Sequence, residues 1–329
     1  MRVLSADDVR QAVPLPDAIE AVAAAFAQLA AGQANAPLRT TIEIPEYDAV
    51  SLFMPARIAG SSAPALGIKV VSVFPQNALG RAQPTISALI NLFDPQSGQP
   101  LAVLDGTYLT ALRTGAASGL ATRLMARADA HRLAIFGAGA QALPQILAVC
   151  AVRPIDTVWI VNRTRDRAGL LAARLRSTGY RGDILIAPSV GQALAEADIV
   201  CTATSSPQPL FADSELRSGT HINAVGAYQP SMAEVPPASI ARARVIVDQR
   251  TAAWAEAGDL VQARAAGLIG DEHIVGEIGD VVQGVVAGRT SDAEITLFKS
   301  VGNALQDMAV ASLALNRAGA LGLGVNVQI

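Results

Sequence analysis

The sequence predicts an α/β protein, with a Rossmann-type doubly wound parallel sheet and a smaller α+β domain. Its 329 residues suggest two domains, at roughly 150 residues per domain. From Arg132 onward, short apolar runs alternate with helix-compatible segments, which is typical of a parallel sheet built from β–α units. The run Leu133–Phe136 breaks into Gly137-Ala-Gly-Ala-Gln-Ala142 before an apolar helix, which is the strand–turn–helix order of a dinucleotide site.

The composition excludes several classes of protein. Hydrophobic residues make up 51% and charged residues 16%, and the net charge of −3 comes without a basic block, so a nucleic-acid partner is not expected. Cys150 and Cys201 lie inside predicted elements and are expected to be buried, reduced thiols. The three histidines lack metal-ligand spacing, so no metal is expected. With neither a signal peptide nor a membrane-length apolar run, we expect a soluble cytoplasmic enzyme.

The first hundred residues predict two helices followed by mainly antiparallel strands. Ser5 is a helix N-cap, and Pro16 opens a second, amphipathic helix that Gly32 ends. Strands are predicted at 39–44, 50–55, 65–74, 85–94 and 100–105. We therefore predict a first domain over residues 1–112.

Residues 113–291 predict the Rossmann domain. A helix rich in small residues is predicted from Leu109 to Ala126. After it, strands at 133–136, 157–161, 183–186, 199–202, 221–225 and 245–248 alternate with helices at 140–152, 166–178, 189–196 and 252–257. We also predict one long helix at 292–318 that returns to the first domain, so that residues 292–329 complete it.

The glycine turn has residue types suited to a dinucleotide. Gly137 allows a tight turn, Gly139 lets the backbone approach a pyrophosphate, and Ala142 keeps the helix close to its strand. The pyrophosphate would lie on free N–H groups at the start of the helix, with Ala138, Ala140 and Gln141 beside it. The alternative is an ordinary strand–helix turn without a ligand.

The corner Asn162-Arg163-Thr164 follows the second strand of this domain. NAD-binding proteins often place an acid near this point for the ribose 2′-hydroxyl, but here the first acid is Asp166. A guanidinium and a hydroxyl suit a 2′-phosphate instead, because charge-assisted hydrogen bonds favour it. We therefore predict NADPH as the preferred cofactor and NADH as a possible one. The alternative is a solvated loop arginine.

Small residues end the fourth and fifth strands of the same domain. Ligands of open α/β sheets bind at the carboxyl ends of the strands. Thr202, Ala203 and Thr204 are therefore expected under the cofactor, with Val225 and Gly226 near its nicotinamide. Plain packing at the strand ends is the alternative for each.

Three cations stand in apolar contexts of the first domain. Lys69 interrupts a strand whose other residues are predicted to be buried, Arg113 lies in the small-residue helix, and Arg39 begins a strand. A buried cation needs an anionic partner, and few acids are near in sequence. A bound carboxylate or phosphate is the predicted partner, and structural ion pairing is the alternative.

Five segments then occur in a characteristic order: Gly67-Ile-Lys-Val, Pro84-Thr85, Leu104-Asp-Gly-Thr-Tyr-Leu-Thr-Ala-Leu-Arg-Thr-Gly-Ala-Ala117, Gly137-Ala-Gly-Ala-Gln-Ala142 and Thr296-Leu-Phe-Lys-Ser-Val-Gly302. Together they resemble the ornithine cyclodeaminase/μ-crystallin family over nearly the whole chain. The resemblance implies a homodimer whose first domain binds substrate and dimerises. In that family the positions of Arg39, Lys69 and Arg113 hold the substrate carboxylate, and Arg113 and Thr114 lie near the cofactor phosphates. By the same resemblance, Thr85 is expected at the cofactor and Ser300 at the substrate.

One departure from the family pattern narrows the expected reaction. Cyclodeaminases of this family carry Asp-x-Pro-Gly-Lys after the fifth strand, where this chain has Tyr228 at the Asp position and Met232 at the Lys position. A phenol with a pKa near 10 is a poor base at neutral pH. The family's ketimine reductases also lack this Asp and carry an Asn-Arg-Thr corner.

The sequence therefore predicts NAD(P)H-dependent reduction of a cyclic ketimine acid. Δ1-Pyrroline-2-carboxylate would give L-proline, and Δ1-piperideine-2-carboxylate would give L-pipecolate. Arg39 and Arg113 would clamp the carboxylate, Lys69 would orient it or relay a proton, and Tyr228 would lie at the substrate. The alternatives are an ornithine cyclodeaminase, then an alanine dehydrogenase or a non-catalytic NADPH-dependent ligand-binding protein.

Overall fold

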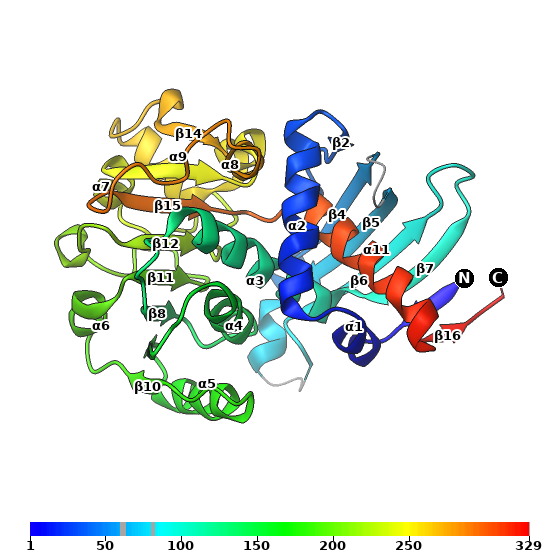
Figure 1. Cartoon of the computed structure of the whole chain (residues 1–329), viewed down its shortest axis with the longest axis horizontal. Coiled ribbons are helices and arrows are strands. Elements are labelled where there is room, and N and C mark those ends of the chain that lie inside the picture. Colours follow the sequence, from blue (N-terminus) through cyan, green and yellow to red (C-terminus); the bar gives the residue numbers. More distant parts are fainter. Residues whose placement is uncertain (60–63, 80–82, 329) are drawn as a thin grey trace. The chain divides into compact units, whose positions relative to one another are not determined.

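A computed structural model describes residues 1–59, 64–79 and 83–328. The chain divides into two compact units (Figure 1). The first unit contains Met1–Arg113 and the residues from Asn303 onward, and the second contains Thr114–Gly302. The chain therefore returns to the first unit at residue 303, and not at residue 292 as predicted.

The first unit is built on one sheet in the order β16-β1-β7-β6-β5-β4-β2, with β3 paired to β4. Its strands are β1 (Arg2–Leu4), β2 (Ala34–Asn35), β3 (Thr40–Ile44), β4 (Ala49–Ile58), β5 (Ala65–Val73), β6 (Ile86–Phe93), β7 (Pro100–Asp105) and β16 (Val325–Asn326). All neighbouring strands are antiparallel except β1 and β7. The five strands predicted from the sequence, β3 to β7, are confirmed, and the short strands β1, β2 and β16 are additional.

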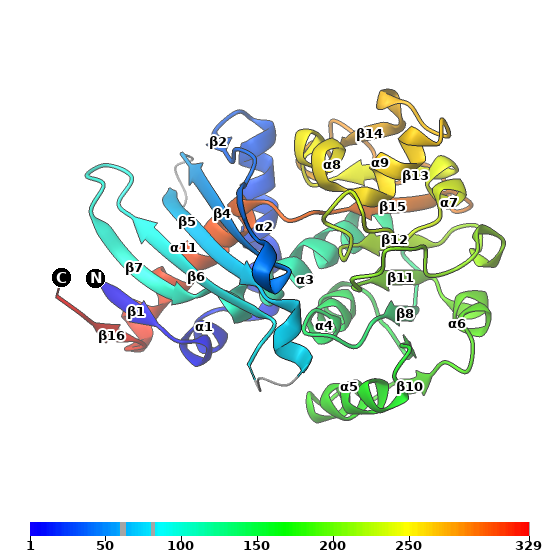
Figure 2. The same cartoon turned by 180° about the vertical axis from the view of Figure 1, so that it is seen from behind.

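Three helices pack on one face of this sheet: α1 (Ala6–Ala12), α2 (Leu15–Ala30) and α11 (Ala304–Leu321) (Figures 1 and 2). The predicted N-cap of α1 is confirmed, because the Ser5 hydroxyl accepts a hydrogen bond from the Asp8 amide, and the Asp8 carboxylate accepts one from the Ser5 amide. Asn303 caps α11 through its side-chain oxygen, which accepts a hydrogen bond from the Leu305 amide.

The prediction of one helix over 292–318 was wrong in its first half. Residues Ile295–Lys299 form strand β15 of the second unit, and α11 begins only at Ala304. The run Ile-Thr-Leu-Phe is rich in β-branched and aromatic residues, and all five residues of the strand are buried. Gly302 then adopts φ +85°, which a helix cannot continue through.

The second unit is a parallel sheet in the order β10-β9-β8-β11-β12-β15-β13-β14 (Figures 1 and 2). Its strands are β8 (Arg132–Phe136), β9 (Thr157–Val161), β10 (Asp183–Ile186), β11 (Ile199–Thr202), β12 (His221–Ala224), β13 (Ala243–Val247), β14 (Ile274–Glu277) and β15 (Ile295–Lys299). Its helices include α4 (Ala142–Val152), α5 (Arg165–Ser177), α6 (Val190–Glu196), α7 (Pro237–Ala241), α8 (Arg250–Glu256), α9 (Gly258–Ala265) and α10 (Ile278–Val282). Helix α3 (Gly106–Met125) belongs to the first unit up to Arg113 and to the second from Thr114. The predicted Rossmann-type parallel sheet is confirmed.

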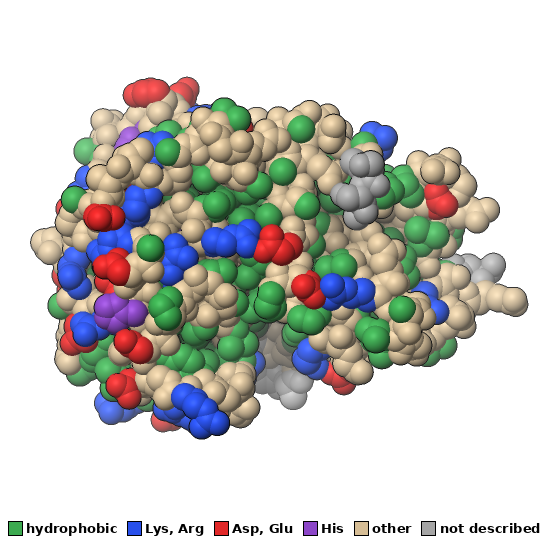
Figure 3. All heavy atoms as spheres, in the orientation of Figure 1, with side chains coloured by type: hydrophobic (Ala, Val, Ile, Leu, Met, Phe, Trp, Pro, Cys, Tyr) green, Lys and Arg blue, Asp and Glu red, His purple; other side chains and the backbone are tan. Residues whose placement is uncertain are grey.

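The charged side chains have two distinct distributions. The chain contains only two lysines, Lys69 and Lys299, and both are buried. The basic side chains on the face drawn in Figure 3 are therefore arginines, and acidic side chains are interspersed with them. Both cysteines are free thiols, with Cys201 buried and Cys150 partly so.

No single helix of the described part of the chain is long and apolar enough to cross a membrane. Helices α1 and α2 reach that length and composition only together, as a pair bent by 85°.

Candidate active site

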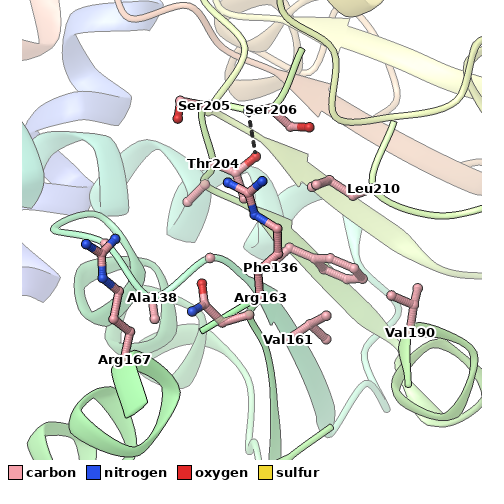
Figure 4. A pocket seen from close by; sticks show the side chains of 14 residues that line it. Phe136, Ala138, Val161, Arg163, Arg167, Val190, Thr204, Ser205, Ser206 and Leu210 are labelled. Atoms are coloured by element: carbon pink, nitrogen blue, oxygen red, sulfur yellow. Dashed lines mark hydrogen bonds between the residues drawn. The ribbon is translucent and has the colours of Figure 1, made fainter. Parts of the chain in front are cut away.

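A cavity of about 320 Å³ lies at the carboxyl end of β8 in the second unit (Figure 4). The predicted glycine turn lines it. Gly137 has φ +100°, and a Cβ there would come 2.7 Å from the carbonyl oxygen of Ala203, so only glycine fits. At Gly139 a Cβ would meet no protein atom within 4 Å, which leaves the backbone open to a ligand. These residues fit the approach of a dinucleotide pyrophosphate to the start of α4.

The predicted phosphate corner lies on the same cavity. Asn162 and Arg163 line it, and the Asn162 amide donates a hydrogen bond to the Thr164 carbonyl at 2.7 Å, which fixes the corner. Figure 4 shows Arg163 and Arg167 extending into the cavity from the β9–α5 corner. Arg167 was not singled out from the sequence. Its place in the first turn of the helix after Asn162-Arg163-Thr164 could have indicated it.

The other predicted cofactor residues do not all line this cavity. Ala203 and Thr204 at the end of β11 do, and so does Ala138. Elsewhere in the second unit lie Thr114, Ala140, Gln141, Thr164, Thr202, Val225 and Gly226, and Thr85 and Arg113 belong to the first unit. The Thr202 hydroxyl donates a hydrogen bond to Glu234 instead. The cofactor roles of these residues remain predictions.

In the first unit, two of the three predicted cations contact the same acidic side chain. Lys69 on β5 is 1% exposed, and its Nζ lies 2.7 Å from Oδ2 of Asp307 on α11. The Nε of Arg113 lies 3.0 Å from the other carboxylate oxygen, and its Nη1 donates to Oε1 of Gln306 at 2.6 Å. Asp307 is fully buried between the two cations.

Asp307 changes the interpretation of these cations. We expected a bound anion because few acids are near in sequence, but folding brings a carboxylate from 194 residues after Arg113. Lys69 and Arg113 therefore form a structural ion pair with Asp307, and the same cations can still bind a ligand. An aspartate inside the apolar helix start Ala304-Leu-Gln-Asp-Met308 could have indicated a buried partner for these cations.

The cluster Lys69–Arg113–Asp307 holds more positive than negative charge. The pKa of Lys69 is lowered to about 7, first by burial and then by the charges of Arg113 and, to a smaller extent, Arg39, while Asp307 opposes this lowering. Arg39 precedes β3 and is half-buried. A second anion in this cluster would be stabilised by the excess positive charge, and would raise the pKa of Lys69.

Comparison with known proteins identifies the family. The model of the ornithine cyclodeaminase/mu-crystallin family matches residues 1–320. The chain belongs to this family. The resemblance predicted from the sequence segments is therefore confirmed, and the fold agrees with it.

Relatives in this family include reductases, dehydrogenases and cyclodeaminases. A Δ1-pyrroline-2-carboxylate reductase of Bacillus cereus is 39% identical over 330 residues, covering 100% of both chains. The structure of Thermococcus litoralis Δ1-pyrroline-2-carboxylate reductase, in complex with NADH and L-proline, matches with TM-score 0.94 and 37% identity over 99% of this chain and 100% of that one. An archaeal alanine dehydrogenase dimer with bound NAD matches with TM-score 0.92 and 32% identity over 100% and 99%.

Two residues predicted at the substrate lie in the second unit. Tyr228, at the position of the cyclodeaminases' aspartate, is half-buried and packs against that unit's apolar core. Ser300 is buried, and its hydroxyl donates to Oδ2 of Asp248 at 2.7 Å. That bond helps to hold the turn between β15 and α11, since Val301 and Gly302 donate backbone hydrogen bonds to the same oxygen. A substrate contact of either residue remains a prediction.

Proposed function

We propose that this protein is an NAD(P)H-dependent reductase of a cyclic ketimine acid. It converts Δ1-pyrroline-2-carboxylate to L-proline, Δ1-piperideine-2-carboxylate to L-pipecolate, or both. The observation that carries the proposal is the buried cluster of Lys69, Arg113 and Asp307, whose excess positive charge suits a carboxylate substrate. The similarity to Δ1-pyrroline-2-carboxylate reductases over the full chain supports the same reaction.

The charges of the cluster support carboxylate binding. The charges of Arg113 and Arg39 act on Lys69, and the carboxylate of Asp307 pairs with both Lys69 and Arg113. A substrate carboxylate would balance the excess positive charge of Lys69 and Arg113 over Asp307, and a guanidinium can bind it through two parallel N–H donors. We assign this clamp to Arg113 and Arg39, so that the imine carbon is held in one orientation.

Lys69 supplies the proton in this proposal. A reduced nicotinamide, when bound, supplies the hydride that the imine carbon accepts. The imine nitrogen needs a proton, and a buried ammonium with a pKa of about 7 can hold one at neutral pH and release it readily. Asp307 keeps Lys69 protonated to a higher pH than burial alone would allow. The reduction is therefore expected to be favoured by acid.

The test of this function is a panel of imino and amino acids with NADPH and NADH, followed at the absorbance of the reduced cofactor. We expect oxidation of NADPH with Δ1-pyrroline-2-carboxylate or its six-membered homologue. Ammonia release from ornithine without net cofactor consumption would overturn the proposal in favour of a cyclodeaminase. The tyrosine at position 228 argues against that outcome, because it provides no carboxylate for the substrate amine.

The preference for NADPH is proposed from the β9–α5 corner. Arg163 and Arg167 line the cavity beside the glycine turn. None of the described residues that line this cavity is an acid that could bind the ribose 2′-hydroxyl. We expect Arg163→Ala to raise KM for NADPH by about 10- to 100-fold and to change KM for NADH little, because a charge-assisted hydrogen bond to the phosphate is lost. Steady-state kinetics with both cofactors measures this.

The matched control for that variant is Arg165→Ala. Arg165 begins α5 and is exposed, but it is not among the residues that line the cavity. Its replacement should leave both KM values unchanged. Equal losses with NADPH and NADH in Arg163→Ala would contradict the assignment of a 2′-phosphate site.

A homodimer is proposed from the free face of the first unit's sheet. Helices cover one face of this sheet (Figure 2). The other face carries apolar side chains that remain accessible. At the centre of this face, Leu89 on β6 is 54% exposed. Its neighbour on strand β5 is Val70, and Leu101 on β7 is also exposed. A second copy would bury this apolar surface. The dimeric archaeal alanine dehydrogenase supports this assembly.

We expect Leu89→Arg to convert the dimer into a monomer, because it places an unpaired charge inside the proposed contact. Light scattering after size-exclusion chromatography measures the molar mass. Leu170→Arg is the control, since Leu170 is 66% exposed on α5 of the other unit. A monomeric wild type, or a dimeric Leu89→Arg, would exclude this face as the contact.

A further inference from the structure

A buried glutamate, Glu234, joins the ends of two neighbouring strands of the second unit. It is fully buried, and its carboxylate accepts five hydrogen bonds. One oxygen accepts from the amide and the hydroxyl of Thr204, at 2.6 and 2.8 Å. The other accepts from the Thr202 hydroxyl at 2.9 Å and from the amides of Gly226 and Ala227 at 2.7 and 3.1 Å.

Five accepted hydrogen bonds fit an ionised carboxylate. Burial raises the pKa of Glu234, and the charge of Lys299 and the Thr204 donors act in the opposite direction. Each oxygen accepts from at least one backbone amide, which can only donate. A proton on either oxygen would take the place of an accepted hydrogen bond, so the ionised form is the one that accepts all five.

A second buried acid fixes the glutamate in turn. Oδ1 of Asp259 accepts hydrogen bonds from the amides of Glu234 and Val235, at 2.6 and 3.0 Å. Oδ2 of Asp259 lies 2.7 Å from the Nζ of Lys299, at the end of β15. All three charged side chains are buried, so Glu234 is anchored through Asp259 to a third strand of the sheet.

The strand ends held by Glu234 are packed without free space. A Cβ at Gly226 would come 2.2 Å from the Thr204 carbonyl oxygen and 2.4 Å from Oε1 of Glu234. Thr204 also lines the cavity that contains the glycine turn. A change at Glu234 would therefore act on the wall of the cavity through Thr204 and Gly226.

The sheet order indicates which half of a dinucleotide this wall serves. The glycine turn follows β8, and the arginine corner follows β9 on one side of it. Strands β11 and β12 lie on the other side of β8. In a doubly wound sheet the two halves of a dinucleotide spread to opposite sides of the pyrophosphate. If the adenosine half lies at Arg163, the nicotinamide half lies at β11 and β12.

We propose that Glu234 is a positioning residue for the nicotinamide half of the cofactor, acting through Thr204 and Gly226. The inference rests on the proposed function only in that the bound dinucleotide is a nicotinamide cofactor. Glu234 touches neither substrate nor cofactor in this proposal. It fixes two strand ends so that the backbone facing the nicotinamide is ordered before the ligand arrives.

Glu234→Gln tests the proposal by binding, without turnover. The amide nitrogen of glutamine would face backbone N–H groups at one strand end in either orientation. We expect the affinity for NADPH to fall about 10- to 100-fold, as for the loss of hydrogen bonds to a charged group. The affinity for adenosine 2′,5′-bisphosphate, which lacks the nicotinamide half, should stay unchanged. Calorimetry with both ligands measures the difference.

Two further variants keep the test decisive. Glu294→Gln is the control, because Glu294 also accepts from a threonine amide and hydroxyl, those of Thr290, away from these strand ends. If Glu234→Gln does not fold, the nearly isosteric Thr202→Val removes one of the five donors. It should weaken the binding of NADPH less than is expected for Glu234→Gln, and leave the binding of adenosine 2′,5′-bisphosphate unchanged.

Equal weakening of both ligands would assign Glu234 a purely structural role and overturn the proposal, as would unchanged NADPH binding. If the wild type binds NADPH but reduces no imino acid, the proposed reaction fails while the inference on Glu234 is still tested. If the wild type binds neither nucleotide, both fail.

Discussion

Replacing Lys69 with methionine is expected to lower kcat for imino-acid reduction by about 10²- to 10⁴-fold, the usual contribution of a positioned general acid. Affinity for NADPH should stay unchanged, because the glycine turn and the arginine corner lie in the other unit. Steady-state kinetics and nucleotide titration measure the two effects. An equal loss of both would show that Lys69 is only structural.

Lys69→Arg separates the two roles proposed for this residue. A guanidinium keeps the positive charge that orients a carboxylate, but it cannot release a proton near neutral pH. If Lys69 is the proton donor, Lys69→Arg should remain as impaired in kcat as Lys69→Met. Recovery of kcat in Lys69→Arg would assign Lys69 to substrate orientation alone.

The pKa of Lys69 can be measured directly, because the chain has only one other lysine. Labelling lysine at Cε should give two NMR resonances, and Lys69→Met removes one of them. We expect that one to titrate near pH 7, so the protonated fraction falls tenfold for each pH unit above it. In wild-type enzyme kcat/KM for reduction should decline over the same range. Saturation with L-proline should raise the pKa, since its carboxylate adds negative charge.

Asp307→Asn is expected to have the largest effect on stability. It removes the carboxylate that pairs with both Lys69 and Arg113. Breaking a buried ion pair by removing one partner costs about 3–5 kcal/mol in the free energy of unfolding. Because Asp307 raises the pKa of Lys69, its loss should lower that pKa below 7. The decline of kcat/KM should therefore begin at a lower pH.

Urea unfolding and pH–rate profiles check these expectations. The matched control is Asp271→Asn, which removes an exposed carboxylate 2.8 Å from Arg264. An exposed pair contributes about 0–1 kcal/mol, so this control should change stability little. If the two variants lose the same stability, or if Asp307→Asn keeps the pH profile of the wild type, the assigned role of Asp307 is wrong.

The elements predicted most accurately are those with a local cause. Strands β3 to β7 follow from alternating apolar residues between turns, and the α1 cap follows from Ser5 and Asp8. The glycine turn and the Asn162-Arg163 corner lie on one cavity because consecutive parallel strands bring their carboxyl ends to one edge of the sheet. The failure came at Ile295–Lys299, where a short apolar run fits both a buried strand and a helix.

The sequence by itself determined the fold class, the glycine turn and the unusual cations, since each depends on residues close together in the chain. Only the tertiary structure decided what those cations face. Asp307 reaches Lys69 from the C-terminal helix, and Glu234 joins strand ends that the sheet order places together. The physical reason is that charge pairing acts through space over a few ångströms, whatever the separation of the partners along the chain. The burial of Lys69 then lowers its pKa, on which the proposed proton transfer depends.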